Sequence, residues 1–167
     1  MMEKQLSAAD RGTAAHKALG ALDLAEISAS AGPARIELIK KQLLEMQKSG
    51  ILTAEEADVI DLSDLITFIT GDLGQRMLAS PRVQREWSFC LMHNEILVQG
   101  VLDLCFMENG GWVLVDYKTD RCPAEALLDL YREQILWYKK ALEEITEVPV
   151  REVWLYSLRN SKAVKVE

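Results

Sequence analysis

The sequence predicts an α/β protein in which several helices precede a mixed β-sheet of about four strands. Three patterns support this prediction: helical periodicity up to residue 79, apolar runs typical of strands over residues 82–116, and a helical segment after residue 123 followed by a final apolar run. A meander of strands followed by a helical crossover to another strand is typical of a mixed sheet with helices on its faces. The expected core order is therefore αβββαβ, with additional helices at the N-terminus.

Length and composition are those of one globular domain over residues 1–167, since 49% of the residues are hydrophobic and 27% are charged. Within it we expect a first helix in 1–30, a helical insertion over 33–80, and a sheet with its crossover helix over 82–158. No apolar run is long enough to span a membrane and the N-terminus lacks a signal peptide, so we expect a cytoplasmic location and no membrane partner. The net charge of −7 argues against strong autonomous DNA binding, because Lys and Arg supply most of the affinity for phosphates.

The N-terminal half of the chain contains apolar stripes at helical spacing, separated by loop and cap signals. The expected helices cover residues 7–27, 34–49 and 72–79, with two shorter helices between the last two. Their expected N-caps are Ser7 for the first, Thr53 in a capping box with Glu56 for the third, and Ser63 or Asp64 for the fourth. We assign no chemistry to the segment that follows the first helix.

Two adjacent predicted strands each carry one carboxylate, Asp103 and Asp116, within an otherwise apolar run. The Asn109-Gly110-Gly111 segment between them indicates a hairpin, which could bring the two carboxylates side by side. Because strand side chains alternate between faces, Lys118 points the same way as Asp116, roughly 6.5–7 Å away along the strand. Charges in such apolar runs are costly and therefore indicate function. They predict a divalent-metal site, and a structural ion pair that closes the hairpin is the alternative.

Several motifs resemble those of one nuclease family. The spacing Asp103-x12-Asp116-x-Lys118 fits the D…(D/E)-x-K pattern of restriction-endonuclease-like nucleases. Asp116-Tyr-Lys-Thr-Asp120 resembles the core motif of the RecB-type nuclease family, within the PD-(D/E)XK superfamily. Gly12-Thr-Ala-Ala-His16 resembles the motif that opens the RecB-type domain, and Gln134-x-x-x-Tyr138 resembles its last motif. Further segments resemble the C-terminal nuclease domain of AddA-type helicase–nuclease subunits: residues 7–13, 50–56, 72–78 and 155–158.

This resemblance implies a restriction-endonuclease-like fold and an exonuclease-type deoxyribonuclease that depends on Mg²⁺ or Mn²⁺. The implied metal ligands are His16, Asp103, Asp116 and the main-chain carbonyl of Tyr117. The two aspartates are also implied to be catalytic, and Lys118 would orient the attacking water or help to deprotonate it. Gln134 and Tyr138 would position the substrate through uncharged hydrogen-bonding groups; the alternative is that they form a polar helix edge.

One glutamate, one histidine and the three cysteines complete the set of candidates. Some RecB-type nucleases hold an iron–sulfur cluster with four cysteines, an arrangement that Cys90, Cys105 and Cys122 cannot repeat. We expect these cysteines to be buried small apolar residues. Glu86 is expected either to support the metal site from a neighbouring strand or to lie on the surface. His93 is expected to lie on the surface in a turn.

The resemblance also implies partners: single-stranded DNA ends as the substrate, the helicase domain of a parent chain, and a second subunit of the AddB type. The chain itself contains no G-x-x-x-x-G-K-[S/T] motif that could serve a helicase. Two alternatives stay open. One is a catalytically silent DNA-end-binding or subunit-interaction module of the same fold. The other is a metal hydrolase of small phosphate esters, for which no phosphate-binding glycine loop is visible.

Overall fold

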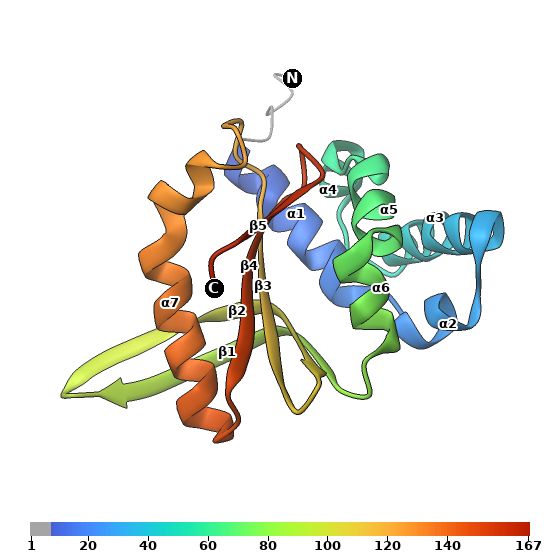
Figure 1. Cartoon of the computed structure of the whole chain (residues 1–167). Coiled ribbons are helices and arrows are strands. Elements are labelled where there is room, and N and C mark those ends of the chain that lie inside the picture. The colour runs from blue at the N-terminus through green and yellow to red at the C-terminus, as the bar shows by residue number, and fades with distance from the viewer. Residues whose placement is uncertain (1–7) are drawn as a thin grey trace. The chain divides into compact units, whose positions relative to one another are not determined.

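The computed structural model of the chain describes the backbone of residues 8–167, which divides into two compact units (Figure 1). The first unit, up to Ala79, is helical, and the second, from Ser80, contains the sheet. The prediction of an α/β fold with a mixed sheet and N-terminal helices is confirmed. The prediction that residues 1–167 act as a single domain stays a prediction. Among the described helices, none combines the length and the apolar character that a membrane-spanning segment requires.

The described part of the first unit consists of short and medium helices. They are α1 (Ala8–Ala21), α2 (Leu24–Ala29), α3 (Gly32–Lys48), α4 (Ala54–Val59), α5 (Leu62–Thr70) and α6 (Asp72–Ala79). The predicted single helix over residues 7–27 is wrong, because Asp23 interrupts it. The Asp23 carboxylate accepts hydrogen bonds of 3.0 Å from the N–H groups of Ala25 and Glu26 and so caps α2. The predicted Ser7 cap lies outside the described residues.

Short polar side chains also set the starts of α4 and α5. Thr53 and Glu56 exchange the two hydrogen bonds of the predicted capping box, at 3.1 and 2.8 Å. The prediction of Ser63 or Asp64 as the next cap is wrong. Asp61 caps α5 instead, since its carboxylate accepts a hydrogen bond of 2.9 Å from the Ser63 N–H.

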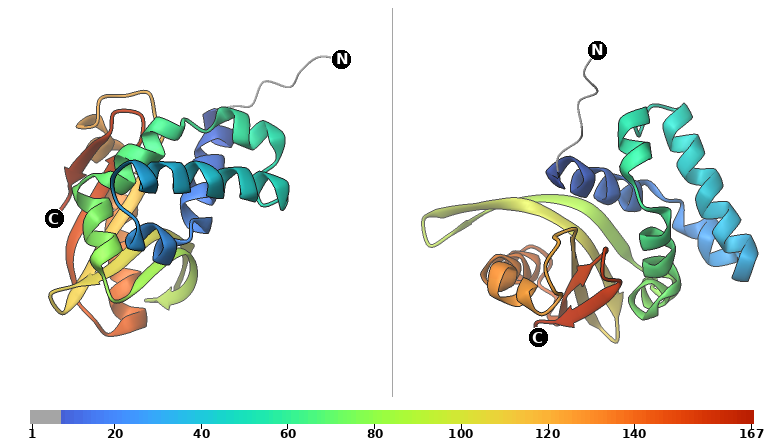
Figure 2. Two further views of the ribbon diagram at one scale, coloured as in Figure 1. Left: turned by 90° about the vertical axis from the view of Figure 1, so that its right-hand side faces the viewer. Right: turned by 90° about the horizontal axis from the view of Figure 1, so that it is seen from above.

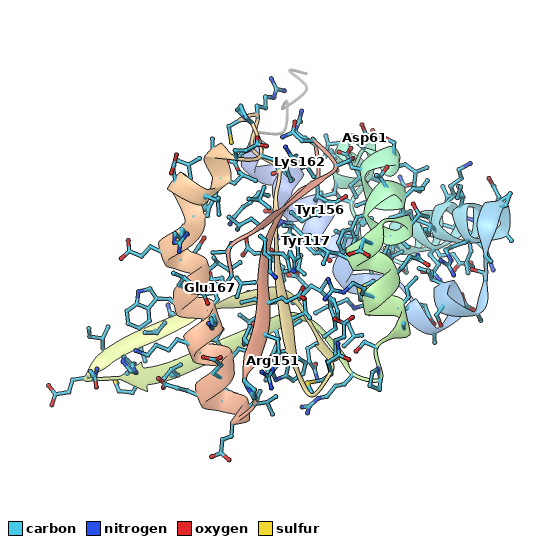
Figure 3. The ribbon with its side chains drawn as sticks, in the orientation of Figure 1. Asp61, Tyr117, Arg151, Tyr156, Lys162 and Glu167 are labelled. Atoms are coloured by element: carbon cyan, nitrogen blue, oxygen red, sulfur yellow. The ribbon has the colours of Figure 1, made fainter. Side chains whose placement is uncertain are left out.

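The second unit is built on a five-stranded sheet in the order β1-β2-β3-β4-β5. The strands are β1 (Val83–His93), β2 (Ile96–Glu108), β3 (Gly111–Lys118), β4 (Val150–Ser157) and β5 (Lys162–Lys165). β3 and β4 are parallel, and the other neighbours are antiparallel. The C-terminal residues are also ordered, because β5 pairs with β4 and the carboxylate of Glu167 (labelled in Figure 3) forms an ion pair with Lys139.

The β1–β2 and β2–β3 hairpins each close with two residues in the left-handed backbone conformation. Asn94 and Glu95 have φ values of 46° and 65°, and Asn109 and Gly110 have φ values of 49° and 75°. Two-residue turns of this conformation match the right-handed twist of the strands that they connect. The predicted hairpin at Asn109-Gly110 is therefore confirmed.

The long helix α7 (Ala126–Thr146) connects β3 to β4 and packs on one face of the sheet (Figure 1). A crossover is needed here because a tight turn cannot join two parallel strands. Seen from above, the long β1–β2 hairpin curves around α7 (Figure 2). His93 of that hairpin, predicted to lie on the surface, is instead partly buried, with its Nδ1 2.8 Å from the Glu144 carboxylate. The buried core contains Phe89, Leu102, Cys105, Trp112, Leu114, Leu127, Ile135, Leu142, Val153 and Leu155.

The three cysteines differ in exposure. Cys105 is buried and Cys122 is partly buried, but Cys90 is exposed, so the prediction that all three are buried is wrong for Cys90. Cys90 lies on β1, where its side chain alternates with those of Phe89 and Leu91, which belong to or pack against the core. Burial raises the pKa of the Cys105 thiol to about 12.

We expect Ellman's reagent at about pH 8 to label Cys90 rapidly in the native protein and Cys105 only after unfolding in urea. The reason is that the thiolate is the reactive form, and Cys105 is both buried and protonated at this pH. The release of thionitrobenzoate at 412 nm, roughly the absorption maximum, measures both phases. A Cys90→Ala variant is the control and loses the rapid phase. Rapid labelling of Cys105 in the native protein would contradict its position in the core.

Candidate active site

The β2–β3 hairpin brings the two predicted carboxylates together. Leu104 pairs with Val115 in the antiparallel register, and continuing this register by one residue on each strand places Asp103 opposite Asp116. Both aspartates are buried, with 8% and 5% of their surface exposed. Two carboxylates at this depth require positive charge close by to offset their desolvation and mutual repulsion.

The pairing of β1 with β2 is irregular at the first of these carboxylates. Glu86 and Asp103 lie opposite each other but do not pair, whereas the residues on either side of them do. Glu86 has a φ of 48°, a left-handed conformation that few residues other than glycine adopt. One of its carboxylate oxygens lies within 4.8 Å of an Asp103 oxygen. The strained backbone therefore coincides with a place where acidic oxygens gather.

This irregularity also changes which side chains of β2 face α7. The core cluster packed against α7 contains both Leu102 and Cys105, which are three residues apart. In a regular strand two such residues would point to opposite faces. The alternation of β2 side chains between the two faces of the sheet is therefore interrupted between Leu102 and Cys105, at Asp103. Local irregularities of this kind re-aim side chains, and here Asp103 points to the same face as its neighbour Asp116.

Asp103 also binds the backbone at the end of β3. Its Oδ2 accepts a hydrogen bond of 2.8 Å from the N–H of Tyr117. Because the N–H and C=O of one strand residue point to the same side, the Tyr117 carbonyl also points toward β2 and Asp103. The Tyr117 side chain lies beside Tyr156 of β4 (Figure 3). Burial, and next the negative charge of Asp103, raises the pKa of the Tyr117 hydroxyl, which stays protonated.

Lys118 supplies positive charge beside Asp116. Both side chains extend to the same side of β3, as the alternation predicts, and the flexible lysine places its Nζ 2.7 Å from Oδ2 of Asp116. The pair is largely buried, since 13% of the lysine side chain and 6% of the aspartate side chain are exposed. Water screens such a pair less than one on the surface. The ammonium therefore compensates negative charge inside the sheet.

Helix α7 faces this strand end with two uncharged groups that the sequence predicts. The Lys118 ammonium donates a hydrogen bond of 3.3 Å to Oε1 of Gln134, and Nε2 of Gln134 donates one of 3.3 Å to the Tyr138 hydroxyl. The two α7 residues lie four positions apart and so share one face of the helix. Asp116, Lys118, Gln134 and Tyr138 thus form one connected set of polar contacts.

A glycine in β2 makes room for the Tyr138 ring. A Cβ atom on Gly100 would lie 2.8 Å from Cε1 of Tyr138 and 3.0 Å from Cε1 of Phe89. Phe89 packs edge-on against Tyr138, with 5.4 Å between the ring centroids. Burial, with a smaller contribution from the charges of Asp116 and Asp103, raises the pKa of the Tyr138 hydroxyl, so this group acts as a neutral hydrogen-bonding group.

Most predicted site residues lie together in the second unit. These are Asp103, Asp116, Tyr117, Lys118, Gln134 and Tyr138. His16 lies on α1 of the first unit, and its role as a metal ligand stays a prediction. Sequence reasoning missed Gly100 and Tyr131, whose ring centroid lies 3.8 Å from the Lys118 Nζ. A glycine inside an apolar strand indicates close approach of another group, whereas an aromatic residue on an amphipathic helix indicates no more than core packing.

The donor atoms at this strand end suit a hard divalent cation. Carboxylate oxygens of Asp103 and Asp116 and the main-chain carbonyl of Tyr117 lie there, with Glu86 next to Asp103. Mg²⁺ and Mn²⁺ prefer such oxygen donors, while structural Zn²⁺ sites are rich in Cys and His. These residues therefore suit a divalent metal ion with oxygen ligands.

Comparison with known proteins identifies the family of this chain. A family model described as the PD-(D/E)XK nuclease superfamily matches residues 2–167. The chain is 34% identical over 191 aligned residues to an ATP-dependent helicase/nuclease subunit of Geobacillus kaustophilus (strain HTA426), and also 34% identical to the subunits of the same name from Bacillus mycoides (strain KBAB4) and Bacillus anthracis. Each alignment covers 100% of this chain and 15% of the relative, so the chain spans a small part of their length. On the family match and these identities, the chain belongs to the PD-(D/E)XK nuclease superfamily.

Proposed function

We propose that this chain is the metal-dependent nuclease domain of a helicase–nuclease and hydrolyses phosphodiester bonds of DNA as an exonuclease. The observation that supports this proposal most is the placement of Asp103 beside Asp116, with the Lys118 Nζ 2.7 Å from Oδ2 of Asp116. Two carboxylates and one ammonium at a strand end are the groups that metal-assisted phosphodiester hydrolysis needs. The name of the relatives supports the wider assignment to a helicase–nuclease.

The proposed metal ligands are Asp103, Asp116, the main-chain carbonyl of Tyr117, and His16. A bound Mg²⁺ or Mn²⁺ supplies Lewis-acid polarisation of the scissile phosphate and favours ionisation of a water. Asp103 has a second task in the proposal, because its hydrogen bond to the Tyr117 N–H fixes the end of β3 on which the other donors lie. The ligand role of His16 rests on its motif and not on any contact described above.

The side chains around the carboxylates have separate tasks in the proposed reaction. Lys118 orients the attacking water, or helps to deprotonate it, and stabilises the negative charge that develops on the phosphoryl oxygens. The water oxygen loses a proton and forms a bond to phosphorus, while the bond from phosphorus to the leaving oxygen breaks and that oxygen takes up a proton, so that the products are a phosphomonoester and a hydroxyl. Gln134 and Tyr138 hold the substrate phosphate through an amide and a phenol, which add no negative charge.

The proposed substrate is the end of a single strand of DNA. The net charge of −7 gives little general attraction for phosphates. We therefore infer that a helicase domain in the parent chain delivers the strand and that the second partner is of the AddB type. The similarity to helicase/nuclease subunits supports this inference.

Asp116→Ala is expected to lower metal-dependent cleavage of labelled single-stranded DNA by about a thousandfold or more, because metal assistance contributes several kcal/mol. The fold is expected to persist, which circular dichroism and thermal melting check. Asp129→Ala, the same substitution at an exposed position of α7, is the control and keeps full activity. EDTA abolishes cleavage in every active variant.

The outcomes of this assay distinguish an active nuclease from a domain that requires its partners and from a silent module. Cleavage that persists in Asp116→Ala rejects the catalytic assignment. If the wild type binds Mn²⁺ but does not cleave, the domain requires its partners, and the assay is repeated with the parent helicase. If the wild type neither cleaves nor binds the metal, the silent DNA-end-binding or subunit-interaction module is favoured.

Lys118→Ala is expected to separate metal binding from turnover. Calorimetry should find Mn²⁺ binding retained, while turnover falls by about a hundredfold or more, because positive charge is lost where negative charge develops. The substitution also removes the cation beside the buried Asp116, so the melting temperature falls in metal-free buffer and recovers in part when Mn²⁺ is added. Loss of metal binding together with turnover would assign Lys118 a structural role.

Gly100→Ala is expected to lower cleavage by roughly tenfold to a hundredfold, because the added methyl group displaces the Tyr138 ring. Metal affinity should stay within about twofold of the wild type, since the atoms nearest to the added methyl group belong to Tyr138 and Phe89, which are not proposed ligands. Tyr138→Phe serves as the partner variant and keeps the ring. If Gly100 acts through the Tyr138 hydroxyl, the combined variant is no worse than the poorer single one. Additive losses would show that Gly100 acts elsewhere.

A further inference from the structure

Tyr131 lies on α7 one turn before Gln134, and its ring packs against the Lys118 ammonium. The lysine Nζ lies 3.8 Å from the ring centroid, well within the reach of about 6 Å for a cation–π contact. The same nitrogen lies 2.7 Å from Oδ2 of Asp116 and 3.3 Å from Oε1 of Gln134. An ammonium has three N–H donors. The ammonium therefore contacts a carboxylate oxygen, an amide oxygen and an aromatic face at once.

The far end of the Tyr131 ring is also fixed. Its hydroxyl donates a hydrogen bond of 2.9 Å to Oδ1 of Asp120, which follows Lys118 by two residues. Burial, and next this hydrogen bond, raises the pKa of the Tyr131 hydroxyl to about 12, so the group remains a donor at neutral pH. Tyr131 thus connects α7 to the segment that leaves β3, and its ring cannot swing away without breaking that bond.

We propose that Tyr131 is a positioning residue whose ring, anchored by Asp120, holds the Lys118 ammonium against Asp116. The contact is argued from geometry alone, whereas its consequence for turnover rests on the proposed nuclease function. A lysine carries its charge on a flexible stem of four carbons, so its ammonium needs several contacts to keep one place. An aromatic face provides such a contact without a negative charge, whereas a further carboxylate would repel the phosphates of DNA.

The position of Lys118 can be measured without any nuclease activity. Reductive methylation with limiting reagent, followed by mass spectrometry, gives the rate at which each lysine reacts. We expect Lys118 to be protected in the wild type and in Tyr131→Phe, which keeps the ring, and to react about tenfold faster in Tyr131→Leu, which removes it. Trp137→Leu is the matched control: it removes an aromatic ring of α7 that packs against His93, and Lys118 stays protected.

A second variant guards against misfolding of Tyr131→Leu. Asp120→Ala releases the hydroxyl of Tyr131 and leaves the helix sequence unchanged, and it is expected to raise the methylation rate of Lys118 in the same direction. Melting temperatures are compared for all variants. Protection of Lys118 that is unchanged in Tyr131→Leu and in Asp120→Ala overturns the proposal.

Cleavage assays test the consequence for turnover. Tyr131→Leu is expected to lower kcat about tenfold and to change KM less than about twofold, with Tyr131→Phe close to the wild type. In a Lys118→Ala background, Tyr131→Leu should have no further effect, because the residue acts through the lysine. An equal loss in both backgrounds overturns the proposal. A wild type that neither binds Mn²⁺ nor cleaves DNA, alone or with the parent helicase, but shows the expected methylation pattern refutes the proposed function and supports the role of Tyr131.

Discussion

The ion pair of Asp116 and Lys118 is the interaction on which the rest of the site depends. A carboxylate with 5% exposed surface in the middle of a sheet is unfavourable unless a cation lies beside it, and the Lys118 Nζ lies at 2.7 Å. The register of the hairpin adds a second carboxylate, Asp103, next to this pair. Under the proposed function, a divalent cation bound by the two carboxylates adds further positive charge at this place. Charge balance inside the sheet thus accounts for the position of the lysine.

The topology of the sheet explains why one helix completes this arrangement. The parallel pairing of β3 with β4 requires a crossover, and α7 provides it. Because α7 begins shortly after the end of β3, its first turns pass the strand end that carries Lys118. Tyr131, Gln134 and Tyr138 follow one another at intervals of three and four residues, so they share one face of the helix. The connection that parallel strands require therefore also delivers the uncharged groups around the lysine.

The sequence predicts those features that leave a periodic or chemically unusual signal. Burial on one face imposes a repeat on helices and strands, and a charge such as Asp116 inside an apolar run is unusual enough to indicate a site. The caps at Asp23 and Asp61 escape prediction because several nearby residues could cap, and hydrogen-bond geometry decides among them. β5 has four residues without a strong pattern and depends on its pairing with β4. The role of Tyr131 escapes prediction because an aromatic residue at this helical spacing is typical of core packing.

An acidic chain can act on DNA if its attraction for phosphate is local. The net charge of −7 excludes a strong general attraction, yet the groups that α7 turns toward Lys118 are an amide, a phenol and an aromatic face, none of which repels a phosphate. Lys118 and, under the proposed function, a bound divalent cation supply positive charge at the site. Such a site contributes little to capturing a strand from solution. It is suited to a strand that a helicase holds in place, because the contacts needed for the reaction are then the only ones that the site itself must make.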